Sequence, residues 1–296
     1  MSETAAAPVA RERGHNQGHG QGHGQGHGHE GGRGHEGGRG RAVTWPFAPP
    51  RGYLTMAGRC ARLASREIDA LMTSLVLPVM LMVTFVYLFG GAISTGTRYV
   101  SYVVPGVLLL CAGVGSAGTA VAVCRDMTGG IIDRFRSMDV GSLPVLSGHV
   151  AASVVRNAAS TVLVLGVALG IGFRPHAGLA AWAAATGLLL LFVLATSWLA
   201  AAFGLLVSSP EAANAFMFVP MIVTYASSAF VPVRTMPAWL HGFAGHQPAT
   251  PVIETLRGLL LGTHVGASGW QALAWCGGIF VVSVGLSAAA FRRRAQ

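Results

Sequence analysis

One short segment of this 296-residue chain combines charged and apolar side chains in a pattern suited to binding another molecule. Ile131, Phe135 and Met138 follow one another at spacings of four and three residues, which places them along one side of a helix. Such an amphipathic helix either lies on lipid headgroups or docks into a groove of a soluble partner and transmits motion to membrane-spanning helices, and the pattern leaves both uses open. Ile132 lies beside the apolar stripe, and the remaining surface carries Asp133, Arg134 and Arg136, after Gly129 and Gly130.

Residue types that support catalysis are scarce. The sequence contains no lysine, and the phosphate-binding P-loop needs one to reach the β and γ phosphates, so a nucleotide-hydrolysing site must belong to another polypeptide. The four cysteines form no CxxC pair and are typical of small core residues. We therefore expect no catalytic, cofactor or metal site in this chain. The histidines beyond the N-terminal region lie far apart, at His149, His176, His241, His246 and His264.

Long uncharged segments dominate the rest of the chain. Charged residues make up only 10% of the sequence, and they divide it into six intervals that contain none. A bilayer core of about 30 Å needs roughly 20 apolar helical residues, so each interval has room for one spanning helix. The sequence predicts an all-α membrane protein with six transmembrane helices. The intervals are Ala70–Thr97, Tyr99–Cys124, Asn157–Phe173, Pro175–Pro210, Ala212–Val233 and Gly258–Phe291.

The arginines predict the orientation of these helices. With the N-terminus in the cytoplasm, eleven arginines near the helices fall inside and four fall outside, the asymmetry expected of the positive-inside rule, so both termini are expected in the cytoplasm. The same distribution argues against a nucleic-acid partner. Arg156 is expected at the cytoplasmic edge, on a helix that begins near Ser147. The inside set is Arg51, Arg59, Arg62, Arg66, Arg125, Arg134, Arg136, Arg156, Arg292, Arg293 and Arg294, and the outside set is Arg98, Arg174, Arg234 and Arg257.

The N-terminal region differs from the rest in composition. Residues 1–50 are rich in Gly and His and lack the apolar content of a packed domain, so we expect a disordered cytoplasmic tail, followed by one membrane domain at 51–296. The tail either chelates a transition metal or is a flexible arm with incidental metal affinity, and the second is favoured. Residues Trp45 to Asp69 predict an N-terminal interfacial helix, with a solvated juxtamembrane helix as the alternative. The tail histidines are His15, His19, His23, His27, His29 and His35.

A second segment of interest lies between the fifth and sixth intervals. From Arg234 to Ser268 the chain is too long for a simple turn, and its prolines, at 237, 248 and 251, interrupt continuous helices. Two short amphipathic pieces, Trp239–Phe243 and Val252–Leu261, predict a re-entrant or interfacial helical hairpin on the extracellular side. Glu254 and Arg257 are spaced to pair on its wet face, a structural pair more than a substrate-binding one.

These two segments resemble the permease subunit of ABC-2 type exporters, in the daunorubicin-resistance-like branch. The first resemblance is Gly130-Ile-Ile-Asp-Arg-Phe-Arg-Ser137 between spans two and three, and Tyr87-Leu-Phe-Gly-Gly91 in the first span also resembles the family pattern. The resemblance implies a cytoplasmic coupling helix that contacts a separate ATPase subunit. The residues expected to make this contact are Gly130, Ile131, Ile132, Asp133, Arg134, Phe135 and Arg136.

The second resemblance covers the hairpin, through Met236–Leu240, Gln247–Arg257 and Gly258–Gly262. In all, the likeness extends over about residues 55–294, with two departures: Asp139 stands where relatives commonly have Pro, and Gln247 replaces a common Asn. The hairpin residues that the resemblance singles out are Pro248, Thr250, Pro251, Glu254 and Arg257.

The resemblance implies a function: export of an amphipathic or lipophilic molecule, such as a drug, secondary metabolite or lipid-like compound, through the bacterial inner (plasma) membrane. Two permease subunits, expected to form a homodimer in contact with membrane lipid, would be driven by ATP-Mg bound in partner ATPase subunits. The alternative is a proton-coupled secondary efflux transporter, which usually holds acidic residues within its spans. The six intervals contain no acidic residue, and Glu211 lies at a boundary, which argues against it. A membrane-embedded enzyme is disfavoured because its convergent polar residues are missing from the sequence.

Overall fold

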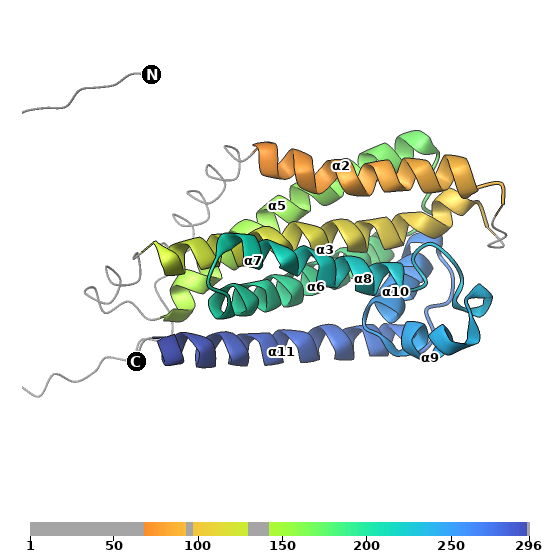
Figure 1. Ribbon diagram of the computed structural model, residues 1–296. Coiled ribbons are helices and arrows are strands. Elements are labelled where there is room, and N and C mark those ends of the chain that lie inside the picture. Colours follow the sequence, from red (N-terminus) through yellow and green to blue (C-terminus); the bar gives the residue numbers. More distant parts are fainter. Residues whose placement is uncertain (1–67, 93–96, 130–141, 295–296) are drawn as a thin grey trace, which may run out of the picture. The chain divides into compact units, whose positions relative to one another are not determined.

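The computed structural model describes residues 68–92, 97–129 and 142–294, with side chains described for 75–92, 97–129 and 146–290 (Figure 1). Every regular element in these ranges is a helix, as the sequence predicts, and the long helices run side by side as a bundle. The predicted N-terminal tail and the segment with Gly130 to Arg136 lie outside the described residues, as does all but the end of the predicted interfacial helix.

Four helices are long and apolar enough to span a membrane, judged by length and composition: Tyr99–Thr128, Leu146–Ile171, Leu179–Leu206 and Ser268–Ala290. They correspond to the second, third, fourth and sixth predicted spans. A shorter apolar helix, Leu75–Phe89, corresponds to the first. The full count of six spans stays a prediction. The helices are α2 (Ile68–Thr84, continued by the π-helical turns η1, Phe85–Phe89), α3 (Tyr99–Thr128), α5 (Ser142–Ile171), α6 (Leu179–Leu206), α7 (Pro210–Asn214), η2 (Ala215–Met217), α8 (Phe218–Tyr225), η3 (Val233–Thr235), α9 (Ala238–His246), α10 (Ala249–Leu261) and α11 (Ser268–Arg294).

Helix α5 differs from its prediction. It begins at Ser142, earlier than the expected start near Ser147, and the apolar helix counted from Leu146 already contains Arg156. At about 1.5 Å of rise per residue, Arg156 lies about 21 Å along the axis from Ser142 and about 22 Å from Ile171. Arg156 lies on this helix, as expected, and its position at the cytoplasmic edge of the membrane stays a prediction. The difference from the prediction is therefore confined to the first turn of the helix, residues 142–146.

The predicted fifth span, Ala212–Val233, is not one continuous helix. Three short helices, α7, η2 and α8, run along α3 and end at Tyr225 (Figure 1). Ser209 caps the start of α7, and Pro220 inside α8 packs against Gly113 of α3, where an added Cβ would lie 2.5 Å from the proline Cβ. A proline removes one backbone donor, so the ladder of helical hydrogen bonds cannot continue unbroken through it.

The predicted sixth interval, Gly258–Phe291, also divides into two elements. Its first residues complete α10, which ends at Leu261 and is followed by Gly262 with φ of 69°, a left-handed conformation that glycine adopts without strain. The spanning helix α11 begins only at Ser268. Residues 258–261 therefore belong to the predicted hairpin and not to the last span.

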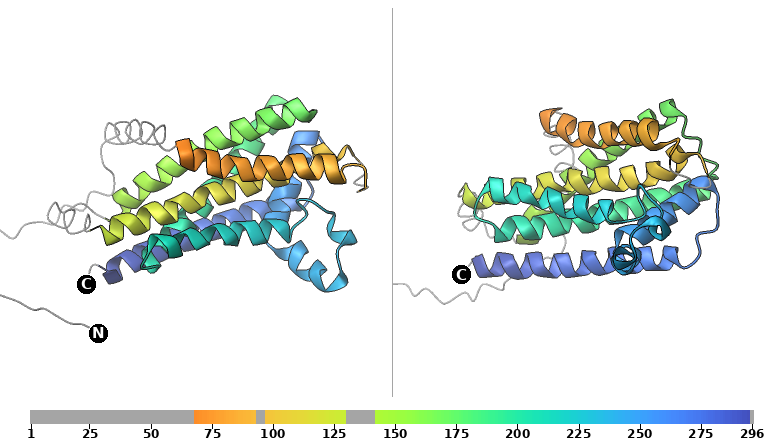
Figure 2. Two further views of the ribbon diagram at one scale, coloured as in Figure 1. Left: turned by 45° about the horizontal axis from the view of Figure 1, so that its top comes forward. Right: turned by 45° about the vertical axis from the view of Figure 1, so that its right-hand side comes forward.

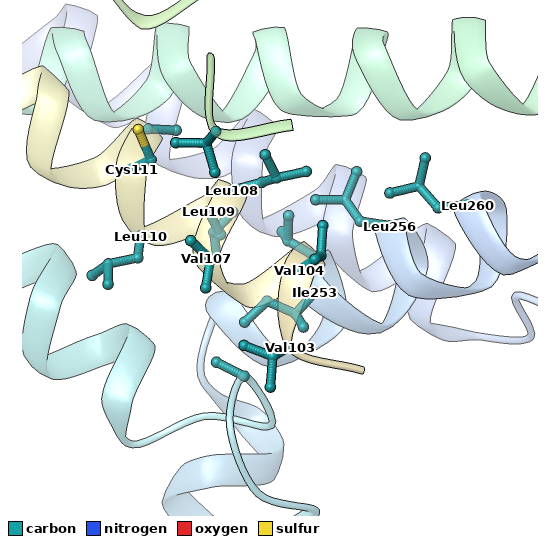
Figure 3. Close-up of a cluster of buried hydrophobic side chains, with 14 of the residues drawn as sticks. Val103, Val104, Val107, Leu108, Leu109, Leu110, Cys111, Ile253, Leu256 and Leu260 are labelled. Atoms are coloured by element: carbon teal, nitrogen blue, oxygen red, sulfur yellow. The ribbon is translucent and has the colours of Figure 1, made fainter. Parts of the chain in front are cut away.

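Helix α3 lies at the centre of the bundle and contacts α2, α5, α6, α7, α8 and α10. Its sequence is apolar on all sides, which suits a helix surrounded by protein. Figure 3 shows its side chains, among them Val103, Val104 and Val107, packed with Ile253 and Leu256 of α10, all fully or almost fully buried. Figure 2 shows α9 and α10 together at one end of the bundle. We call this the hairpin end, and the opposite end, where α3 stops and α5 starts, the loop end.

Candidate functional site

The predicted coupling residues, Gly130 to Arg136, lie outside the described residues, so their contacts stay predictions. The structure does describe the two helices that lead into and out of this segment. Asp126, in the last turn of α3, pairs with His149 on α5. Oδ2 of Asp126 lies 2.8 Å from Nε2 of His149, close enough for a hydrogen bond or an ion pair. The two side chains are 31% and 24% exposed, so the pair is only partly screened by solvent. It ties together both helices that flank the predicted coupling segment.

In the sequence, His149 is an isolated histidine, and no spacing rule connects it to Asp126, since the two residues are 23 positions apart.

A further charged residue at the loop end is Glu211, in the first turn of α7. The pKa of the exposed Glu211 carboxyl lies below its ordinary value because its own backbone N–H and Ser209 donate hydrogen bonds to it, with a smaller attraction from Arg125. Glu211 is thus held as an anion beside Arg125, close to where α3 ends.

At the hairpin end, the structure contains the two predicted short helices as α9 and α10. Pro237 and Pro248 occupy the position before the first helical residue of each, so the prolines delimit these helices as expected. Pro251 was also expected to interrupt a helix, and that is wrong. It lies in the first turn of α10, where backbone N–H groups have no intrahelical acceptor and proline is tolerated.

The turn that follows α8, residues 226–230, is held by side chains from the hairpin. The Gln247 amide donates to the carbonyl oxygen of Ala226 at 2.8 Å, and the backbone N–H of Ser228 donates to Oγ1 of Thr250 at 3.3 Å. Arg257 donates from Nη2 to the carbonyl oxygen of Ser228 at 2.8 Å. These contacts satisfy backbone groups of a non-helical segment, which an apolar surrounding requires.

Gln247 is one of the two departures from the family pattern, and the structure assigns it a contact: it is buried and its amide bonds the turn at residues 226–230. Tyr99, the first residue of α3, adds a further bond to the same turn, from its hydroxyl to the carbonyl oxygen of Phe230 at 2.9 Å. Two of the hairpin residues singled out by sequence, Thr250 and Arg257, thus meet at one turn, together with Gln247 and Tyr99.

Arg257 also contacts the central helix. Its Nε and Nη2 donate to the carbonyl oxygen of Tyr102 at 3.2 and 3.1 Å, and its guanidinium carbon lies 3.7 Å from the centroid of the Tyr102 ring. This geometry combines hydrogen bonds from a cation with a cation–π contact. Arg257 therefore joins three segments: α10, the start of α3 and the turn after α8.

The expected pairing of Glu254 with Arg257 is wrong. Among the described side chains, no ion pair joins them, because Arg257 turns toward α3 while Glu254 is exposed on α10. The two groups still influence each other. The pKa of the Glu254 carboxyl lies above its ordinary value because the protein around it removes part of its hydration, and the attraction of Arg257 offsets only part of this effect.

A third group of polar residues lies inside the bundle and was not anticipated from the sequence. Ser116 of α3 bonds Thr196 of α6 at 3.0 Å and accepts from Ser197 at 3.3 Å. Ser197 bonds Ser153 of α5 at 2.9 Å, and the Asn157 amide donates to Ser153 Oγ at 3.2 Å. We call these five buried side chains the polar layer. The sequence signal was present in the i, i+4 spacing of Ser153 and Asn157, but spacing along one helix does not show which polar residues of other helices lie beside it.

No group of three or more His, Cys, Asp or Glu side chains suited to a metal ion occurs in the described part of the chain. The described side chains thus form a bonded Asp126–His149 pair at the loop end, a hydrogen-bonded turn at the hairpin end and a polar layer between them.

Comparison with known proteins supplies an independent view. The sequence model of the family described as ABC-2 type transporter matches residues 51–261. The chain is 29% identical over 214 residues to a daunorubicin resistance ABC transporter permease protein, DrrB1, of Streptomyces coeruleorubidus, covering 72% of this chain and 73% of that protein. It is 25% identical over 231 residues to a probable doxorubicin resistance ABC transporter permease protein, DrrC, of Mycobacterium tuberculosis, covering 77% and 84%.

Proposed function

Because the chain belongs to the ABC-2 type transporter family, we propose that it is the permease subunit of an ATP-driven exporter and that a separately encoded ATPase subunit drives it. The family match over residues 51–261 is the observation that carries this proposal. It agrees with a sequence that has no lysine for a P-loop of its own. The chain is an integral membrane protein, and we place it in the bacterial inner membrane with both termini in the cytoplasm and the hairpin outside.

The ATPase docks, in this proposal, on the coupling segment Gly130–Arg136. The Asp126–His149 pair supports this, because it holds together the helices on either side of that segment. ATP bound in the partner supplies the energy. Within this chain, a force on the segment would pass directly into α3 and α5, the two helices that it connects. Movement of packed helices against each other is a common way to alternate between inward- and outward-facing states.

We propose a homodimer whose subunits share the transport pathway. Helices α5 and α11 each expose large apolar side chains along their length, which suits contact with lipid or with a second subunit. An amphipathic or lipophilic cargo fits such surfaces, and the relatives' names mention daunorubicin and doxorubicin. Examples of the exposed side chains are Val162 and Leu163 on α5 and Val281, Val282 and Leu286 on α11.

The test is reconstitution of the permease with its ATPase in vesicles, with doxorubicin as the probe. Charge reversal by Asp133→Arg or Arg134→Glu is expected to weaken ATPase association and to lower transport. Arg234→Glu is the matched control, since this exposed arginine lies in η3, just before the hairpin helix α9. Unchanged complex formation and unchanged coupled hydrolysis in both reversal variants would disprove the docking assignment. Efflux that persists without ATP, under a proton gradient, would instead favour the proton-coupled alternative.

A further inference from the structure

Helix α5 rests on α3 through a contact that depends on the absence of a side chain. A Cβ built on Gly115 of α3 would lie within 3.0 Å of Oδ1 of Asn157 and 3.1 Å from its Cγ. The Asn157 amide therefore lies directly against the α3 backbone, and only glycine leaves room for it. Asn157 itself is 1% exposed, so this polar group is buried between two helices.

The hydrogen bonds of Asn157 are incomplete. Its Nδ2 donates twice to Ser153, to the backbone carbonyl at 3.0 Å and to Oγ at 3.2 Å. Its Oδ1, however, has no hydrogen-bond partner among the described residues. A buried acceptor without a partner is disfavoured, because it has lost water and gained nothing in exchange, and so it needs an explanation.

A complementary group lies one helical turn away. Thr119, four residues after Gly115, is on the same face of α3, toward the loop end. It is 1% exposed, and its hydroxyl likewise has no hydrogen-bond partner in the described part of the chain. One unpaired acceptor on α5 and one unpaired donor on α3 thus occur at neighbouring levels of the same helix pair.

We propose that Asn157 is a positioning residue for transport: α5 shifts along α3 toward the loop end, and Oδ1 of Asn157 then accepts a hydrogen bond from Thr119. The inference rests on the proposed function, in which the coupling segment just before α5 moves this helix. Gly115 permits the shift because it presents no side chain to the moving amide. In the second arrangement both polar groups are satisfied, and this gain offsets the loss of the Ser153–Ser197 hydrogen bond that the shift of α5 would break.

The decisive variant is Thr119→Val, which keeps the shape of the side chain and removes the hydroxyl. In the described arrangement it removes an unpaired buried group, so the thermal stability of the complex should stay the same or rise. In the shifted arrangement it removes a hydrogen bond, so ATP-driven doxorubicin transport should fall about threefold to tenfold. A residue with a purely structural role would not show higher stability together with slower transport.

Two further variants complete the experiment. Ser287→Ala is the matched control, because Ser287 on α11 is also buried and its hydroxyl has no hydrogen-bond partner among the described residues. The thermal stability of this variant should stay the same or rise, as in Thr119→Val, whereas its transport rate should be that of the wild type. Asn157→Ala should slow transport, and the double variant with Thr119→Val should be no slower than the slower single variant. If Asn157→Ala does not fold, Thr119→Val alone decides.

Each experimental result leads to one conclusion. Slower transport without loss of stability, confined to the Thr119 and Asn157 variants, supports the proposal. Thr119→Val with wild-type transport, a parallel loss of stability and transport, or an equal loss in Ser287→Ala overturns it. If the wild-type complex itself fails to transport with its ATPase, the proposed function fails first, and the two failures are thereby distinguished.

Discussion

The guanidinium group of Arg257 lies over the ring of Tyr102, 3.7 Å from its centroid, and donates hydrogen bonds to the carbonyl oxygen of that same residue. Arg257 belongs to the hairpin helix α10 and Tyr102 to the first turn of the central helix α3. A third bond from Arg257 reaches Ser228 in the turn after α8. A movement of the hairpin relative to α3 would break all of these contacts.

Replacing Arg257 with leucine should therefore loosen the hairpin end. The variant leaves the carbonyl oxygens of Tyr102 and Ser228 without this donor, at a cost of about 1–3 kcal/mol for unsatisfied buried groups, and it removes the cation–π contact. We expect a lower melting temperature in detergent and faster hydrogen exchange at residues 226–230. Arg234→Leu is the control, since Arg234 is exposed in η3. An equal effect of both variants would argue against the assignment.

Gln247 offers a test of side-chain length. Both Gln247→Ala and Gln247→Asn should free the carbonyl oxygen of Ala226, because asparagine is one methylene shorter and does not reach it. Loss of one hydrogen bond in this setting is worth about 1 kcal/mol. Hydrogen exchange at residues 226–230 should quicken in both variants and stay unchanged in Gln271→Ala, an exposed glutamine on α11. Wild-type exchange in Gln247→Asn would show that the shorter amide still reaches the turn.

Alanine substitutions of two glycines on α6 should have different effects on the stability of the protein. A Cβ on Gly204 would press on the backbone of Ala120, with its Cα 3.0 Å away, whereas nothing lies within 4 Å of a Cβ on Gly187. Gly204→Ala should destabilise the protein by about 1–3 kcal/mol, the usual effect of overpacking. Gly187→Ala should be neutral or stabilising, because alanine favours the helix by up to about 1 kcal/mol. Thermal unfolding of the two variants provides the comparison, and the reverse order would contradict the close contact of α6 with α3.

The Asp126–His149 pair should matter more for coupling than for stability. Partly exposed ion pairs contribute about 0–1 kcal/mol, so Asp126→Asn and His149→Gln should each lower the melting temperature only slightly. With the anchoring of α3 to α5 weakened, the reconstituted complex should hydrolyse ATP while transporting less doxorubicin per ATP. The double variant should equal the single ones, since each removes the same contact. Additive losses would mean that the two residues act separately.

Glu254 and Glu211, two exposed carboxylates, should contribute to the stability of the protein with opposite dependence on pH. The pKa of Glu254 is raised from 4.5, so its contribution to stability is present in acid and is lost as the pH rises through the pKa of the folded state. Glu254→Gln should therefore be more stable than the wild type at neutral pH, with a difference that shrinks on acidification. The pKa of Glu211 is lowered from 4.5, so its contribution is present at neutral pH and lost as the pH falls.

Glu211→Gln should accordingly be less stable than the wild type at neutral pH, and the two should converge in acid. Melting temperatures measured from pH 4 to pH 8 compare both variants with the same wild-type protein. Profiles of the same sign for both residues would show that their surroundings differ from those described.

Features that depend on neighbours in the sequence were predictable. Uncharged intervals predicted the apolar helices, because insertion depends on the summed hydropathy of one segment. Pro237 and Pro248 marked the starts of α9 and α10, because proline acts on its own backbone and on the residue before it. The motif around Gly130 and the hairpin pattern pointed to the family that the comparison then confirmed.

Contacts between distant residues were decided by the tertiary structure alone. Arg257 had Glu254 as its partner by spacing, yet it bonds Tyr102, 155 residues away, because the helix packing places backbone carbonyl groups within its reach. The close contact of Asn157 with Gly115 likewise follows only from the packing of α5 on α3. Hydropathy along a chain determines which segments leave water, whereas the partner of each buried polar group depends on which helices pack together, and that depends on shape across the whole bundle.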